Sequence, residues 1–311
     1  MKNLVMIALL AAAGCASAPR YPPLPLLSVG DAAALLGSQC PPPGWDRARL
    51  DALKAADFEI ADADERAVFA TSIVACLGIN DPDLRDGIAF EALSHMLRGR
   101  QLSEDTMRML LQDLKVRLKS REPLGFEQPF AALALAEVAR ADRIAPYLIE
   151  DELVQLLADA QHWFINISDY RGFSDADGWR HAVAHGSDLL MQLALNPRID
   201  KEGLRLIVST VGTQVAPEPH AYVHGEPERL VRPILFAAQR GVMTEDEWTN
   251  WLTALATPLD ASKMFSSEVG LAWRHNTLAF LQALLANVTL SDDQAVQVLR
   301  PGVEAALKAL P

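Results

Sequence analysis

Several features that would point to a familiar class of protein are scarce in this sequence. Of 311 residues only three are cysteines, and aromatic residues make up 6%. The 28 lysines and arginines are outnumbered by 40 acidic residues, which leaves a net charge of −12. Because no basic cluster is present, nucleic acid is not an expected partner, and neither is an anionic lipid surface bound through charge.

Short catalytic motifs are missing as well. The sequence contains no G-x-S-x-G, no phosphate-cradling glycine loop and no dinucleotide-binding glycine pattern. No alternation of polar and apolar residues extends far enough to indicate a strand. Neither a reaction nor a substrate can therefore be named from a motif.

The N-terminus has the signature of export. An apolar run over residues 4–13 follows Lys2 and is about half as long as the roughly 20 residues that a spanning helix needs. Ala-Ala-Gly precedes Cys15, which resembles the bacterial lipobox, where cleavage occurs before a lipid-modified cysteine. We expect a signal peptide over 1–14 and a lipid on Cys15 that anchors the chain at the membrane of the cell envelope. No aspartate follows this cysteine, which favours the outer membrane and a periplasm-facing protein; the alternative is cleavage after Ala18, giving a soluble periplasmic or secreted protein.

The segment 15–44 is predicted to be a tether. It is rich in proline, which favours an extended and semi-rigid chain. No Gly- or Ser-rich gap interrupts the rest, so 45–311 is predicted to be one domain.

Cys40 and Cys76 leave two interpretations open. An exported chain lies where disulfides persist, so the two residues are a candidate bridge. Alternatively, Cys76 is a buried free thiol, because it lies in the apolar run VFATSIVACL.

Apolar residues recur at i, i+3 and i+4 throughout, which predicts an all-α protein. Helix-start signals occur at Asp81-Pro82, Ser103, Thr244 with Glu247, and Ser291 with Gln294. The expected helices cover residues 46–56, 65–78, 82–98, 103–119, 125–141, 149–167, 176–195, 199–214, 226–240, 244–256, 263–285 and 291–308. Pairs of helices recur at roughly 40 residues, which favours an α/α superhelix of HEAT- or armadillo-like hairpins. An irregular helical bundle is the alternative.

The stretch 169–190 is the most informative. Within the helix expected over 176–195, His181, His185 and Asp188 fall on one side, away from its apolar stripe. Two histidines one turn apart can bind a divalent metal, and the carboxylate can join them. The segment HAVAH lacks the glutamate of H-E-x-x-H, so a zinc-protease mechanism is not indicated.

Two further interpretations of this stretch stay open. One is a metal-free groove for binding or catalysis. The other is structural, with His185 or Asp188 hydrogen-bonded to Arg171 and to the loop before the helix.

The helix over 226–240 is expected to run beside the helix over 176–195, because second helices of successive hairpins stack in one layer. Their N-terminal halves would then form one site. Glu228 would reach His181 or His185 directly, and Arg229 would neutralise Asp188 or hold an anionic ligand.

The run GWRHAVAHGSDLL, with Arg171-Gly172 before it, is similar to the pattern of a bacterial family known as domain of unknown function 2785. Weaker likenesses lie in DPDLRD, GEPERL and NTLAFLQAL, and the resemblance covers roughly residues 50–285. It implies an all-helical, repeat-like fold and no established activity. The candidate catalytic residues are His181, His185, Asp188 and Glu228, and the candidate ligand-binding residues are Arg85, Arg171, Trp179, Arg229 and Asn276.

The expected function is a membrane-anchored binding or scaffold module of the envelope. Its ligand, an envelope protein or a small molecule, would bind the concave face of the helical array. The alternative is a hydrolase or related enzyme that uses His181, His185 and Asp188, with a divalent metal as the one cofactor indicated, or without it.

Overall fold

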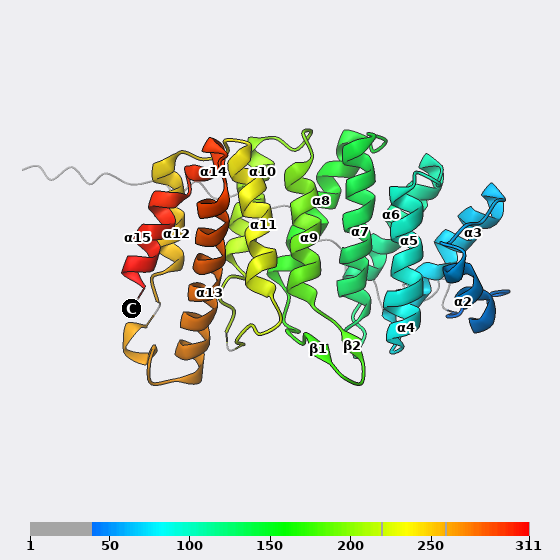
Figure 1. Ribbon diagram of the computed structural model, residues 1–311, viewed down its shortest axis with the longest axis horizontal. Coiled ribbons are helices and arrows are strands. Elements are labelled where there is room, and N and C mark those ends of the chain that lie inside the picture. Colours follow the sequence, from blue (N-terminus) through cyan, green and yellow to red (C-terminus); the bar gives the residue numbers. More distant parts are fainter. Residues whose placement is uncertain (1–38, 219, 259, 311) are drawn as a thin grey trace, which may run out of the picture.

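The computed structural model describes residues 39–218, 220–258 and 260–310, and the regular elements among them are helices apart from two short strands (Figure 1). The predicted all-α class is confirmed. The α-helices are α2 (Arg47–Ala55), α3 (Ala63–Ile73), α4 (Pro82–Leu84), α5 (Glu91–Arg98), α6 (Glu104–Lys119), α7 (Glu127–Ile144), α8 (Glu150–Ile165), α9 (Ala182–Leu195), α10 (Lys201–Gly212), α11 (Glu226–Gln239), α12 (Glu245–Leu255), α13 (Glu268–Leu290), α14 (Gln294–Gln297) and α15 (Arg300–Ala309). Shorter elements are the 3₁₀-helices η1 (Val74–Gly78) and η3 (Ala261–Lys263), the π-helix η2 (Arg85–Phe90), and the strands β1 (Phe173–Ser174) and β2 (Gly178–Trp179).

The helices follow one another along the long axis of the molecule, from α2 and α3 at one end to α12 and α15 at the other (Figure 1). One row contains α5, α7, α9, α11 and α13, and each of these helices contacts the next. A second row contains α6, α8 and α10, which pack on α7, α9 and α11 respectively. Helix α9 therefore lies between α7 and α11, with α8 and α10 against it as well.

Most helix starts are those that the sequence predicts. Asp81, Ser103 and Thr244 each accept a hydrogen bond from a backbone N–H of the first turn, which satisfies a donor that has no partner inside the helix. The start predicted at Ser291 is wrong. Asp293 is the capping residue there, and α14 begins one residue later.

The helix predicted over 176–195 is wrong in its first six residues. The strands β1 and β2 pair there as a short antiparallel hairpin. His181 follows with a φ of 59°, in the left-handed region, and α9 begins only at the next residue. A residue in this conformation cannot belong to a right-handed helix, so the hairpin and the helix meet at an abrupt corner.

The N-terminal boundary of the domain lies earlier than predicted. A disulfide joins Cys40 to Cys76 in η1. Pro42 and Trp45 are buried, and the indole packs against Phe69 with ring centroids 4.5 Å apart. Residues 40–44, assigned above to the tether, are therefore part of the folded domain.

Other predictions about the N-terminus lie outside the described residues. They are the signal peptide over 1–14, the lipid on Cys15 and the cleavage site after Ala18. Within the described ranges, no helix combines the length and the apolar character needed to cross a membrane.

Candidate functional site

His181 stands at the corner between the β1–β2 hairpin and α9. Its N–H donates to the carbonyl oxygen of Arg171 at 3.1 Å, and its own carbonyl oxygen accepts from the N–H of His185 at 3.0 Å. The imidazole is buried and stacks on the indole of Trp179, with ring centroids 4.6 Å apart. The left-handed corner thus places this imidazole beneath a half-exposed aromatic ring.

The Nε2 atom of His181 is buried and has no hydrogen-bond partner among the described residues. An oxygen of Glu226 lies 3.7 Å away, which is too far for a direct hydrogen bond. Burial, followed by the charges of Arg229 and His224, lowers the pKa of His181 to about 4, and a hydrogen bond to the His224 backbone opposes the shift. His181 is therefore neutral near pH 7.

His185 lies one turn further along α9. Its Nδ1 donates to the carbonyl oxygen of Pro129 at 3.2 Å, which leaves Nε2 as an unprotonated acceptor. The ring of Phe130 meets the imidazole edge to face at 5.1 Å. Burial, followed by repulsion from His181 and Arg229, lowers the pKa of His185 to about 3. Helix α7 therefore holds this histidine in one neutral tautomer.

Their position away from the apolar stripe of α9 does not leave these side chains exposed. His181, His185 and Asp188 are all buried, although they do share one side of the helix. The reason is that α9 contacts α7, α8, α10 and α11, so packed helices cover its polar side as well as its apolar side.

Asp188 is neutralised by α11. Its Oδ1 accepts from Arg229 Nη1 at 3.0 Å and from Arg232 Nη1 at 3.5 Å. Burial raises the pKa of Asp188, while the two arginines oppose that shift. The predicted ion pair with Arg229 is confirmed, and so is the prediction that the N-terminal halves of these two helices are neighbours.

The acidic residue that faces the histidines is Glu226 and not Glu228. Glu228 is exposed, whereas Glu226 is buried. Oε2 of Glu226 accepts from the N–H of His224 at 2.9 Å, and Oε1 lies 3.7 Å from His181 Nε2 and 3.8 Å from His224 Nδ1. Two residues along a helix correspond to a rotation of about 200°, so the two glutamates point in nearly opposite directions.

His224 belongs to the site but carries only a weak signal in the sequence, its position beside GEPERL. Its Nδ1 is buried, and no residue in the described ranges forms a hydrogen bond with it. Gly172 packs directly against the imidazole, and a Cβ atom at that position would overlap the ring. The glycine before the hairpin therefore makes room for a histidine that lies far away in the sequence.

Arg85 has a structural role. Its guanidinium is completely buried and lies over the ring of Phe126, 4.0 Å from its centroid. It donates to the carbonyl oxygens of Ile79 at 3.0 Å and Asp177 at 2.9 Å, and it pairs with Asp86. These contacts fix the β1–β2 hairpin to η2, so Arg85 positions the site without belonging to its surface.

Arg171 lies apart from the histidines. Its half-exposed guanidinium pairs with Asp169 and donates to the carbonyl oxygen of Leu124 at 3.1 Å. The predicted hydrogen bonds from Arg171 to His185 or Asp188 are not formed, and only its backbone contacts His181.

Asn276 holds the loop that carries His224. Its Oδ1 accepts from the N–H of Tyr222 at 2.8 Å, and its Nδ2 donates to the carbonyl oxygen of His220 at 2.7 Å. Because the amide is completely buried and bonded at both ends, Asn276 supports the site and offers no group to a ligand.

The arrangement contains no ligand set for a metal. Nowhere in 39–218, 220–258 or 260–310 do three His, Cys, Asp or Glu side chains lie where they could hold one ion. Asp188 is bonded to two arginines, and His185 Nδ1 is bonded to Pro129. The metal site predicted at His181, His185 and Asp188 is therefore not formed by these side chains.

A family model described as "Protein of unknown function (DUF2785)" matches residues 114–286. The chain belongs to the DUF2785 family. No curated protein and no solved structure matches it. The region matched by the DUF2785 model runs from the second half of α6 into α13, and so includes every residue of the site at the start of α9 and α11.

Within the DUF2785 region, the site offers two kinds of chemistry. Its surface carries the rings of Phe173 and Trp179, 5.0 Å apart, with exposed fractions of 47% and 37%, and the partly exposed side chains of Arg229 and Arg232 lie on the neighbouring α11. Beneath this surface, Glu226 faces two buried imidazole nitrogens that have no partner. The exposed surface can stack on a ligand and form ion pairs with it. The buried group around Glu226 can exchange a proton.

Proposed function

We propose that this protein is a binding module of the bacterial cell envelope, anchored by a lipid on Cys15 and facing the periplasm. The apolar N-terminal run and the small residues before Cys15 support this location. The disulfide between Cys40 and Cys76 supports it independently, because structural disulfides persist in oxidising compartments and are rare in the cytosol. The partner is an envelope protein or a small ligand.

The helical array is, in this proposal, an α/α superhelix of HEAT- or armadillo-like hairpins. The two rows of helices and the contacts between successive members support this arrangement. The binding surface lies at the edge of the array where α9 and α11 begin, instead of on a concave face, because the exposed aromatic and basic side chains of the site gather at that edge.

The observation that favours binding over catalysis is the engagement of the side chains that a catalytic mechanism would use. Asp188 is held by Arg229 and Arg232, and His185 is held by Pro129 in a deeply buried, neutral state. A general base needs a free lone pair within reach of a substrate. Oδ1 of Asp188 and Nδ1 of His185 are already engaged in these contacts.

The exposed rings of Phe173 and Trp179 provide the complementary argument. Large aromatic side chains are usually buried, and adjacent exposed rings offer a flat apolar surface at a low cost in conformational entropy. The half-exposed guanidinium groups of Arg229 and Arg232 have donors left over after pairing with Asp188. We therefore expect a ligand with a flat apolar part and hydrogen-bond acceptors.

Fractionation of cells tests the location. The wild-type chain should remain with the membrane fraction, and Cys15→Ala should move to the soluble fraction of the envelope. A wild-type protein found in the cytoplasm would refute the envelope location.

A binding screen tests the site. Purified protein is titrated with cell-wall fragments, envelope saccharides and envelope proteins, and binding is measured by calorimetry. Trp179→Ala should weaken binding at least tenfold, whereas Leu271→Ala, at an exposed leucine on α13, should not change it. Equal loss in both variants would contradict a binding surface at the β1–β2 hairpin.

A second candidate function is acid–base catalysis, such as hydrolysis, at Glu226. The observation that favours it is the pair of unpartnered nitrogens, on His181 and His224, within 3.8 Å of one carboxylate oxygen. Catalytic hydrogen bonds are often long before substrate binds. If the protein hydrolyses any ester, amide or glycoside substrate in a screen, Glu226→Gln should abolish the activity. Glu228→Gln, on the exposed neighbouring acid, should leave it unchanged, and the reverse result would exclude Glu226 as the acid or base.

A further inference from the structure

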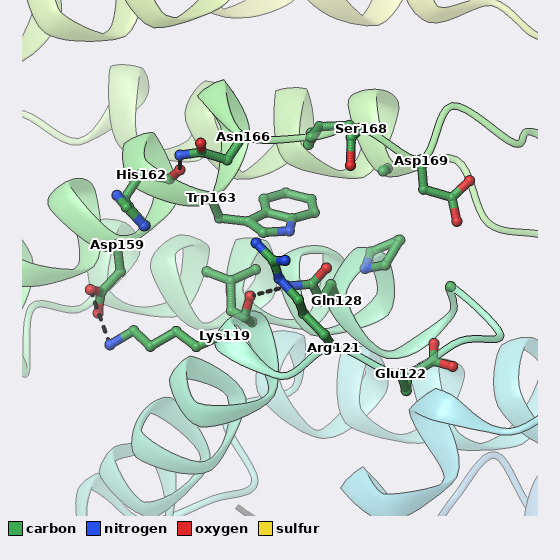
Figure 2. A pocket seen from close by; sticks show the side chains of 15 residues that line it. Lys119, Arg121, Glu122, Gln128, Asp159, His162, Trp163, Asn166, Ser168 and Asp169 are labelled. Atoms are coloured by element: carbon green, nitrogen blue, oxygen red, sulfur yellow. Dashed lines mark hydrogen bonds and ion pairs between the residues drawn. The ribbon is translucent and has the colours of Figure 1, made fainter. Parts of the chain in front are cut away.

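A pocket of about 260 Å³ lies where α6 and α8 end and α7 and α9 begin (Figure 2). Lys119, Arg121, His162 and Trp163 are among its lining residues, together with Ala182, the first residue of α9. None of the side chains of the proposed binding surface lines it. The pocket is therefore separate from the site at the β1–β2 hairpin.

The carboxylates that line the pocket are already engaged. Asp159 is buried and forms ion pairs with Lys115 and Lys119, each at 3.2 Å. Glu122 accepts hydrogen bonds from backbone N–H groups just before and at the start of α7. The carboxylate of Asp169 is held by Arg171. These groups therefore leave little negative charge to attract a cation.

The cationic side chains that line the pocket, by contrast, have N–H donors that these contacts do not use. Within the described part of the chain, Arg121 has no ion-pair or hydrogen-bond partner. Figure 2 shows its side chain lying across the pocket beside the indole of Trp163, with Lys119 and Asp159 to one side. An ammonium group has three N–H donors, and the contact with Asp159 uses only one of those of Lys119. The charge in the pocket that no ion pair neutralises is therefore positive, although the net charge of the chain is −12.

The start of α9 adds to this preference. The helix begins at Ala182 and no side chain caps it. The first N–H groups of a helix carry partial positive charge and favour an anion. Helix α7, whose first residues also line the pocket, differs because Glu122 already caps it.

We infer that this pocket binds the oxyanion group, a carboxylate or a phosphate, of a small molecule. The planar guanidinium of Arg121 suits two parallel hydrogen bonds to such a group, and Lys119 contributes a second positive charge. The ring of Trp163 forms an apolar wall for the rest of the ligand. The volume of about 260 Å³ lies just below the range of about 300 to 1,000 Å³ common for ligand pockets, so the ligand is small.

Titration of the full-length protein with inorganic phosphate, with acetate and with uncharged glycerol tests the inference. Binding is followed by calorimetry at constant ionic strength. Phosphate or acetate should bind, glycerol should not, and comparison of the two anions identifies the headgroup. Arg121→Gln should weaken anion binding at least tenfold. Arg100→Gln, at an exposed arginine outside the pocket, removes the same charge and should retain the wild-type affinity.

Because Arg121 is exposed and has no partner to lose, the variant should fold normally, and its urea-unfolding midpoint checks this. Equal anion affinity in the wild type and in Arg121→Gln would overturn the inference. So would the absence of binding of either anion to the wild-type protein. Either failure would leave the envelope binding site at Trp179 unaffected, because that site is tested with Trp179→Ala and shares no side chain with this pocket.

Discussion

Two buried histidines, His181 just before α9 and His185 within it, should make the fold sensitive to acid. Their pKa values fall to about 4 for His181 and about 3 for His185, compared with about 6.5 in an unfolded chain. Below about pH 6.5 the unfolded chain therefore takes up protons that the native state does not. Stability is fully present above this pH, and it is lost as the pH falls from about 6.5 through the native pKa of each group.

The loss in the free energy of unfolding follows from the pH interval between the unfolded and the native pKa values. At pH 5 the solution is about 1.5 units below the unfolded pKa and still above both native values, so each histidine lowers the free energy of unfolding by about 2 kcal/mol. Together they account for about 4 kcal/mol, a large part of the stability of an ordinary domain. Asp188 acts in the opposite direction, because burial raises its pKa and protonation therefore relieves a cost at low pH.

Urea unfolding at pH 7, 6 and 5, followed by tryptophan fluorescence, measures the effect. In His185→Gln, the amide can still donate to Pro129 but cannot titrate. This variant should be less stable at pH 7, yet it should lose about 2 kcal/mol less than the wild type between pH 7 and pH 5. Because Asp188 is present in both proteins, its contribution cancels in the comparison.

Ser187→Ala is the matched control. Ser187 is a buried residue of the same helix, and its hydroxyl donates to the carbonyl oxygen of Val183 at 2.7 Å. Its removal should lower stability equally at every pH, because nothing that titrates is lost. If His185→Gln keeps the full pH dependence of the wild type, the assignment of His185 as a neutral native group is refuted.

Three further changes test the contacts that build the site. Arg85→Met should lower the free energy of unfolding by about 3 kcal/mol in urea, because buried carbonyl groups lose their donor; a loss below about 1 kcal/mol would mean that water replaces the guanidinium. Gly186→Ala should cost about 1 to 3 kcal/mol, since the new Cβ would lie 2.5 Å from the ring of Phe164, and a thermal midpoint equal to that of the wild type would contradict this packing. Cys40→Ser should cost about 4 kcal/mol for a separation of 36 residues, and reductant should then have no further effect on the variant.

Local signals explain why most of the helices could be predicted. A helix start depends on a capping side chain and the three residues after it, so Asp81, Ser103 and Thr244 identify their helices without reference to the rest of the fold. Repeated i, i+3, i+4 spacing likewise records which face will be buried. The Ser291 start failed because Asp293, two residues later, offers a competing cap.

The prediction that residues 176–181 are helical failed for a nonlocal reason. The hairpin that replaces it is held by Arg85, whose guanidinium bonds the carbonyl oxygen of Asp177, and by Gly172, which makes room for His224. The partners are about 50 to 90 residues apart in the chain. No helical periodicity within 176–181 could reveal them.

The all-α class, the positions of most helices, and the neighbourhood of α9 and α11 with its ion pair between Asp188 and Arg229 could be inferred before the fold was known. These follow from helical spacing and from the short connections between hairpins, which are local properties. Two features could be seen only in the packed fold: Glu226 and not Glu228 faces the histidines, and the polar side of α9 is buried. Burial and pKa depend on every group packed around a side chain, and for His185 those groups come from α7 and α11, which only the packed fold brings within reach.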